Sequence, residues 1–196
     1  MKSFQIGSLF SIAVSAALTV NPAFALPGER TEAVLTWMNA NPTLQPTTGN
    51  SLTVRREDTP SRRFRFQASA LPPGRISVPT TPGRIRSEKF EIVDIVNGVP
   101  MQRLEESLRA IYGLDIYNDY ALASLLYSYP HADTLEQGRR QNLPSLGAQR
   151  GELREGKRFA YWVEVTYAED GKPLNGQVTL LLKDDLEKLA SELRDR

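Results

Sequence analysis

The sequence predicts an α+β domain with a mainly antiparallel sheet of about five strands and helices packed on one face. Apolar and polar residues alternate in two pairs of segments, as in β-hairpins, and four other segments carry apolar residues at helical spacing. The segments come in runs of strands and runs of helices rather than in strict alternation, which favours α+β over α/β. The expected order is one helix, three strands, two helices, two strands and a final helix.

The first 25 residues predict a cleavable secretory signal peptide. Lys2 is followed by an uncharged stretch over 4–20, Asn21-Pro22 breaks it, and Ala23 and Ala25 stand at the −3 and −1 positions of a signal peptidase site. An uncleaved anchor is the alternative, but a spanning helix needs about 20 apolar residues. We expect export by the general secretory route and a periplasmic or extracellular mature chain with no transmembrane span.

The next region, residues 26–50, predicts a helix over 29–39 and then a Pro/Thr-rich loop. The single α+β domain is expected to occupy residues 51–196.

This domain begins with a predicted β-hairpin. Segments 51–56 and 62–69 alternate apolar and polar residues around the turn residues 58–61. Segment 90–96 is dense in apolar residues and is the best candidate for a central strand.

Two helices are predicted in the middle of the chain. Apolar residues at helical spacing indicate a helix over 101–112, ended by Gly113, and a second helix over roughly 116–127, which stops before Pro130. Residues 131–156 lack periodicity and predict a long irregular segment, of the kind that serves as a binding loop or is mobile.

The C-terminal part predicts a second hairpin and a last helix. Segments 159–168 and 174–183 alternate around Asp170-Gly171, which is a strong hairpin signal. Asp184 is expected to cap the helix, with Glu187 at its third position. The helix is expected to bury an apolar stripe: Leu186, Leu189, Ala190 and Leu193.

A short repeat precedes the third strand. Pro73-Gly74-Arg75-Ile76 recurs as Pro82-Gly83-Arg84-Ile85. Pro-Gly suits a type II turn, so we interpret the repeat as two turns around an extended piece, with a repeated ligand loop as the alternative.

Composition narrows the function classes. There is no cysteine, which excludes thiol catalysis, Fe–S clusters, disulfides and a lipoprotein anchor. Without Lys2 the mature chain carries equal numbers of basic and acidic side chains, so its total charge gives no reason to expect nucleic acid as a partner. Basic residues are nevertheless concentrated between Arg55 and Lys89.

The sequence offers little for catalysis and no cofactor site. His131 is the only histidine, and no serine elbow, phosphate loop or metal motif accompanies it. The Asp115, Asn118 and Asp119 group is interpreted as capping of the second helix. Neighbouring acids, Glu105-Glu106 and Asp184-Asp185, point in different directions on a helix and are not expected to converge on a catalytic site.

The first candidate binding residues are Arg62, Arg63 and Arg65 in the first hairpin, where cations alternate with phenylalanines. They favour an anionic partner of the envelope over nucleic acid, because of the predicted export. Protection of the sheet edge against aggregation is the alternative.

The second candidates are Tyr117, Tyr120 and Tyr127, from a cluster of five tyrosines within 112–129. Tyr120 and Tyr127 would share one helical face, forming an aromatic platform for a sugar or peptide. Packing of the helix on the sheet is the alternative.

The leading hypothesis is therefore a non-enzymatic, exported binding or interaction module of the bacterial envelope. Its partner would be an envelope protein or an anionic envelope polymer. A small exported hydrolase, using carboxylates that the fold brings together, is the main alternative, and a structural subunit of an assembly is the third.

Overall fold

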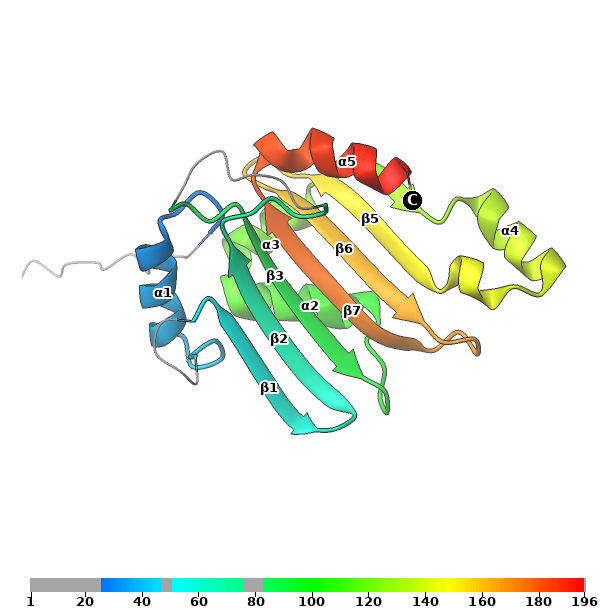
Figure 1. Ribbon diagram of the computed structural model, residues 1–196, viewed down its shortest axis with the longest axis horizontal. Coiled ribbons are helices and arrows are strands. Elements are labelled where there is room, and N and C mark those ends of the chain that lie inside the picture. Colours follow the sequence, from blue (N-terminus) through cyan, green and yellow to red (C-terminus); the bar gives the residue numbers. More distant parts are fainter. Residues whose placement is uncertain (1–25, 47–50, 76–82, 196) are drawn as a thin grey trace, which may run out of the picture.

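The strands of this chain join into one antiparallel sheet of seven strands, in the order β1-β2-β3-β7-β6-β5-β4 (Figure 1). The computed structural model describes residues 26–46, 51–75 and 83–195. The α+β class is confirmed, with seven strands rather than about five.

The N-terminal half contributes three neighbouring strands: β1 (Thr53–Thr59), β2 (Arg62–Ser69) and β3 (Ser87–Asp94). The first hairpin is confirmed, and the apolar segment of the third strand lies inside the sheet between β2 and β7. Helix α1 (Thr31–Ala40) lies at the end of these strands and buries Val34 and Met38 in the main core (Figure 1).

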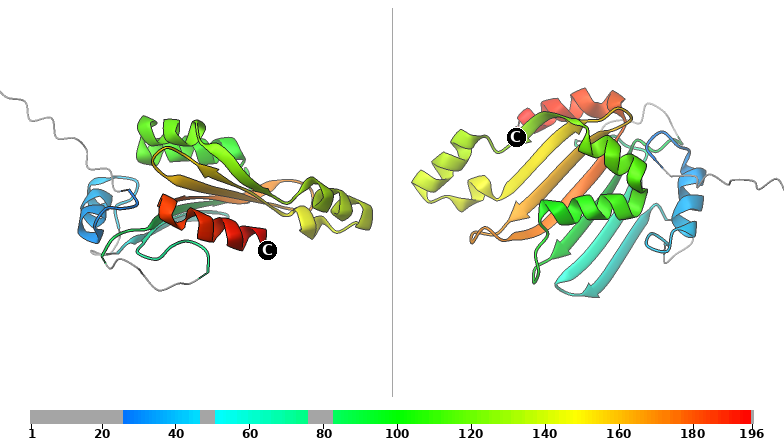
Figure 2. Two further views of the ribbon diagram at one scale, coloured as in Figure 1. Left: turned by 90° about the horizontal axis from the view of Figure 1, so that it is seen from above. Right: turned by 180° about the vertical axis from the view of Figure 1, so that it is seen from behind.

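Helices α2 (Met101–Tyr112) and α3 (Leu114–Ala121) cover one face of the sheet, as the view from behind in Figure 2 shows. Gly113 separates them and has a φ of 81°, which residues with a side chain rarely adopt. Leu104 of α2 packs directly on Gly176 of the sheet, where a Cβ atom would collide with it.

The second hairpin, β6 (Ala160–Tyr167) and β7 (Pro173–Leu181), is confirmed. After the 3-10 turn η2 (Lys183–Asp185), helix α5 (Leu186–Arg194) lies across the opposite face of the sheet from α2 and α3 (Figure 2). The expectation that all helices pack on one face is therefore wrong. All four members of the predicted apolar stripe of α5 are buried, against a second cluster that includes Leu153, Ala160 and Leu181.

The segment 122–156 differs most from the prediction. Residues expected to continue the second helix form the edge strand β4 (Ser124–Tyr129). The segment expected to be irregular contains α4 (Ala132–Gln141), the 3-10 turn η1 (Pro144–Gly147) and β5 (Gln149–Glu155). Helix α4 and η1 extend beyond the end of the sheet (Figure 1).

The segment that follows β2 lies along α5. Lys188 Nζ donates to the carbonyl oxygens of Pro73 and Arg75, and the carboxylate of Glu192 accepts from the Arg75 amide at 2.7 Å. Gly74 and Gly83 have φ values of 91° and 78°, as the predicted turns require; the stretch between them lies outside the described residues.

A buried ion pair joins the residue before β3 to the 3-10 turn η2 that follows β7. Arg86 Nε donates to Asp185 Oδ2 at 2.9 Å, and its Nη2 donates to Oδ1 at 2.7 Å. Asp185 is thus buried and neutralises an arginine, whereas Asp184 is exposed. No side-chain cap bond forms at the start of α5, and the predicted cap by Asp184 is wrong.

The described helices include none with both the length and the apolar character needed to cross a bilayer.

One ionisable side chain stands in the centre of the main core. Glu88 of β3 is fully buried, and neither of its carboxyl oxygens has a hydrogen-bond partner among the described residues. The Tyr112 hydroxyl acts on its pKa but is not placed for a well-formed hydrogen bond. Burial dominates and raises the pKa of Glu88 to about 8, so the folded protein holds this carboxyl protonated at neutral pH.

We predict that Glu88→Gln removes a pH dependence of stability between pH 4.5 and 8. The folded state raises the pKa above its ordinary 4.5, so the stabilising contribution is complete below that value and falls as pH rises toward 8. Between pH 4.5 and pH 8 the free energy of unfolding of the wild-type protein falls by on the order of 4 kcal/mol from this group. Glutamine has no proton to lose, so the variant does not show this fall. Urea unfolding of both proteins at pH 5 and pH 8 measures the effect. If the free energy of unfolding changed equally between pH 5 and pH 8 in the two proteins, Glu88 would not be the cause of the pH dependence.

Candidate binding site

Strand alternation divides the predicted arginine cluster between the two faces of the sheet. Phe64 and Phe66 face the main core, so Arg63 and Arg65 project from the opposite face. Arg65 pairs in register with Arg55 of β1 and Glu91 of β3, which places these side chains in one row on the face that α5 only partly covers.

Two hollows lie on this face along β2 and β3. The first has a volume of about 230 Å³ and is lined by Arg55, Glu57, Arg63, Phe64, Arg65, Glu91 and Val93. The second, of about 240 Å³, is lined by Gln67, Ser69, 71–74, Ser87, Lys89, Trp162 and Thr179. Gln67 and Lys89 pair in the row next to Arg65 and Glu91, so the hollows lie end to end. We call them together the sheet-face groove.

The lining of the groove carries more positive than negative charge: Arg55, Arg63, Arg65 and Lys89 stand against Glu57 and Glu91. Arg63, Arg65 and Lys89 form no ion pair with any described residue, and Arg55 lies 3.9 Å from Glu57 in an exposed pair. Such exposed pairs contribute little binding energy. An approaching anion would therefore compete with few internal contacts.

Two polar atoms beneath the groove lack partners. Arg65 Nε and Thr179 Oγ1 are buried and make no hydrogen bond within the described chain. Thr179 is only 2% exposed and lines the second hollow. The remaining atoms of this kind in the described residues belong to Glu88 and Tyr112, so unsatisfied polar atoms occur at the groove and in the core pair.

Beside the groove, hydrogen bonds hold a set of side chains from β4, β6 and β7. The Tyr129 hydroxyl donates to Glu164 and accepts from Trp162 Nε1 at 2.8 Å, while Gln177 Nε2 donates to Glu164 at 3.2 Å. Gly151 makes the arrangement possible, because a Cβ atom at residue 151 would overlap the hydroxyl and ring edge of Tyr129. These bonds orient Trp162, which lines the second hollow.

Arg62, the third predicted arginine, lies away from the groove. Its Nε is 3.5 Å from Asp94 Oδ2, which also receives Arg103 Nη1 at 2.8 Å. Hydrogen bonds from the Asn97 backbone and from Arg103 hold the pKa of the buried Asp94 well below its usual range. The role of Arg62 here is structural, at the turn that follows β3.

The predicted tyrosine platform does not form. Tyr117 and Tyr120 belong to α3, whereas Tyr127 belongs to β4 and packs on the α5 side against Tyr129. Tyr120 is buried, and burial raises its pKa far above the ordinary value. The shared helical face expected for Tyr120 and Tyr127 is therefore wrong, because the helix ends at Ala121.

The fold brings two distant carboxylates together. Glu105 and Glu152 both lie within hydrogen-bond reach of the Tyr120 hydroxyl, at 3.3 and 3.2 Å. Arg154 binds Glu152 through two hydrogen bonds, of 2.6 and 3.0 Å. Glu105 lines a hollow with Gln102, Glu106, Arg109 and Tyr117, and Glu152 is not part of that lining.

The other candidates for chemistry have structural surroundings. Asp119 does not cap α3: it accepts hydrogen bonds from the Arg158 and Phe159 amides and from Tyr161, which fixes the turn before β6. His131 precedes α4 and contacts the ring of Tyr127 edge-on. The described residues contain no group of three potential metal ligands. The cleavage residues Ala23 and Ala25 lie outside the described residues.

The sequence predicted some of the arginines that line the groove as binding residues, but it did not predict their neighbours. Polar residues alternate with apolar ones in strands β3 and β7, among them Lys89, Glu91 and Gln177. Such alternation indicates a sheet face that is exposed to solvent. Only the strand order brings these three residues beside Arg65.

Comparison with known proteins adds no functional assignment: no protein-family model matches the chain, and searches of the curated proteins and of the solved structures find no match. The functional case therefore depends on the residues of this chain.

We predict that Gly151→Ala destabilises the protein by about 1–3 kcal/mol, since the new methyl group displaces Tyr129 and breaks its bonds to Glu164 and Trp162. Thermal and urea unfolding measure the loss. In a Tyr129→Ala background the same glycine substitution should cost nothing, because the overlapping ring is absent. An equal cost in both backgrounds would contradict this account of Gly151.

Proposed function

We propose that this chain is a non-enzymatic, exported binding module of the bacterial envelope, and that it holds an acidic segment of a partner protein in the sheet-face groove. The observation that carries the proposal is the set of three cations, Arg63, Arg65 and Lys89, that line the groove without an ion pair among the described residues. Guanidinium groups bind carboxylates through paired, charge-assisted hydrogen bonds.

The lining of the groove favours a protein segment over a uniformly charged polymer. Glu57 and Glu91 stand among the arginines and would repel a polymer with an anion at every repeat. At the other end, Leu71, Pro72 and Pro73 form an apolar wall. A segment with acidic side chains followed by apolar ones complements both ends.

Export is the second part of the proposal. It is supported by the order of charge, apolar stretch and small residues in the first 25 residues. An exported module would meet segments of envelope proteins, and the groove would select the acidic ones among them.

A hydrolase has less support. It would need two carboxylates that face a cleft, with one of them available to take or give a proton. Glu105 and Glu152 share the hydroxyl of the buried Tyr120, and Arg154 neutralises Glu152. This arrangement ties α2 and α3 to β5 and engages both carboxylates in contacts within the protein.

The experiment is to select peptides from a random 12-residue display library on the mature protein. We expect the selected peptides to combine Asp or Glu with apolar residues. The double variant Arg63→Ser/Arg65→Ser should weaken a selected peptide by about 10- to 100-fold, because it removes two sites of charge-assisted hydrogen bonding. Isothermal titration at two salt concentrations measures the affinity, which should fall as salt rises.

Arg62→Ser provides the matched control. It removes a cation from the same strand but from outside the groove, so peptide affinity should stay unchanged. Selected peptides without acidic residues, or equal losses in the control and the double variant, would show that the groove does not bind acidic segments.

A further inference from the structure

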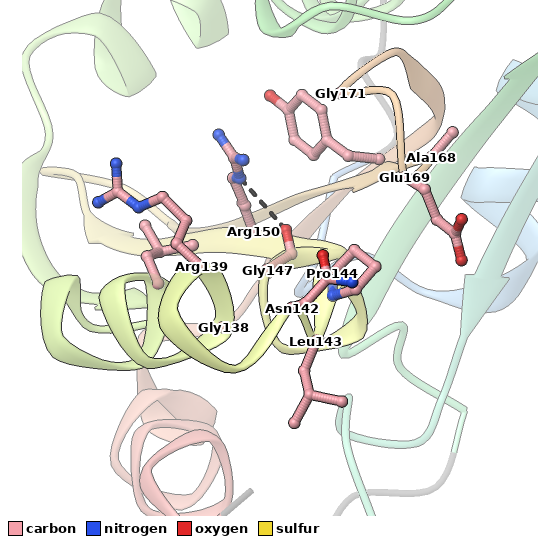
Figure 3. A pocket seen from close by; sticks show the side chains of 12 residues that line it. Gly138, Arg139, Asn142, Leu143, Pro144, Gly147, Arg150, Ala168, Glu169 and Gly171 are labelled. Carbon is pink, nitrogen blue, oxygen red and sulfur yellow. Dashed lines mark hydrogen bonds between the residues drawn. The ribbon is translucent and has the colours of Figure 1, made fainter.

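A third hollow lies between α4–η1 and the turn that joins β6 to β7 (Figure 3), at the opposite end of the molecule from β1 (Figure 1). Its volume is about 470 Å³. Arg139 from α4 and Arg150 from β5 extend toward the same side of it, as Figure 3 shows. We call this hollow the α4 cavity.

Arg150 is held in place by two contacts. Its guanidinium group stacks on the ring of Tyr167 at 4.3 Å from the centroid, and its Nε donates to the carbonyl oxygen of Gly147 at 3.3 Å (Figure 3). Both contacts leave the two terminal nitrogens available. A guanidinium that is already oriented loses less conformational entropy when it binds an anion.

The charges around the cavity are unbalanced. Neither Arg139 nor Arg150 forms an ion pair with a described residue, whereas the next residue along α4, Arg140, pairs with Glu136. Glu169 is the one acidic residue in the lining, which leaves a net charge of +1 from Arg139, Arg150 and Glu169.

The end of α4 opposes this positive charge less than a helix end with free carbonyl groups would. Exposed carbonyl groups at a helix C-terminus repel anions. Here the carbonyl of Gly138 accepts from the Leu143 amide, and that of Arg139 accepts from the Asn142 amide. Asn142 adopts a left-handed conformation, with a φ of 51°, that allows the chain to close the helix in this way.

We propose that the α4 cavity binds a phosphate monoester, with Arg139 and Arg150 as the two residues that hold its oxygens. Two guanidinium groups from different elements can each donate to a separate oxygen of one phosphate. The cavity, with its volume of about 470 Å³, has room for the phosphate and for part of the organic group to which it is attached. This site is separate from the sheet-face groove and does not depend on the function proposed for it.

The test uses the whole mature protein with three probes: phenyl phosphate, benzoate, and vesicles that contain phosphatidic acid, whose headgroup is a phosphate monoester. Isothermal titration measures the two small molecules, and sedimentation measures the vesicles. Binding of phenyl phosphate identifies a soluble ester as the source, and binding of vesicles alone identifies a lipid headgroup; both support the proposal. In either case Arg139→Gln or Arg150→Gln should weaken binding about tenfold.

Arg140→Gln is the matched control, since it changes the adjacent arginine of the same helix, and it should leave binding unchanged. Arg63→Ser/Arg65→Ser should also leave it unchanged, which separates this site from the groove. The proposal is overturned if neither phosphate probe binds, if benzoate binds as tightly as phenyl phosphate, or if Arg140→Gln weakens binding as much as Arg150→Gln. Arg139, Arg140, Arg150 and Arg63 are exposed and Arg65 is partly buried, so the variants should fold, and circular dichroism verifies this.

Discussion

The pairing of β3 with β7 joins two separately connected halves of this chain into one sheet. Strands β1 to β3 come from the first half of the described sequence, and β4 to β7 come from the second. The two halves meet from Ser87 opposite Leu181 to Val93 opposite Asn175. The buried pair of Arg86 and Asp185 stands where this seam begins, and removing either partner would leave a charge unpaired in the interior. Every feature that spans the sheet, including the sheet-face groove, depends on the register that the seam sets.

The two faces of the sheet differ because the helices cover them unequally. One face supplies the main core beneath α2 and α3, and α5 covers only part of the other. The side of β3 that faces the main core is therefore largely apolar, with Glu88 as an exception, and its other side can be polar. Lys89 and Glu91 of β3 face the groove, while Phe90 and Ile92 are buried in the core. The groove is what remains of the second face where α5 does not reach.

The sequence predicted the elements whose pattern is local. Asp170-Gly171 between two alternating segments identified the β6–β7 hairpin, and the apolar stripe identified α5. Strands β4 and β5 have no such pattern: Tyr127 continues the spacing of the preceding helix, and in β5 only Gly151 and Leu153 are buried. Their pairing with each other and with β6 makes them strands, and a single segment does not contain that information.

The candidate site shows the same limit. Alternation within β2 already separates Arg62 from Arg63 and Arg65, so the sequence could have excluded Arg62 from a shared binding face. The positions of Lys89, Trp162 and Thr179 beside the groove follow from strand order and could not be predicted. The α4 cavity could not be predicted for a similar reason. It lies between α4, in a segment that was predicted to be irregular, and the turn of a distant hairpin.

The buried carboxyl of Glu88 has a consequence for the reaction of folding itself. In the unfolded chain at neutral pH this group is ionised, and in the folded protein it carries a proton. Folding therefore takes up close to one proton from the solvent. The heat of folding measured by calorimetry should accordingly depend on the ionisation enthalpy of the buffer. In an acidic compartment the chain would already hold that proton before it folds, so acidity would assist the folding of this protein until its other carboxylates, Asp94 among them, begin to titrate.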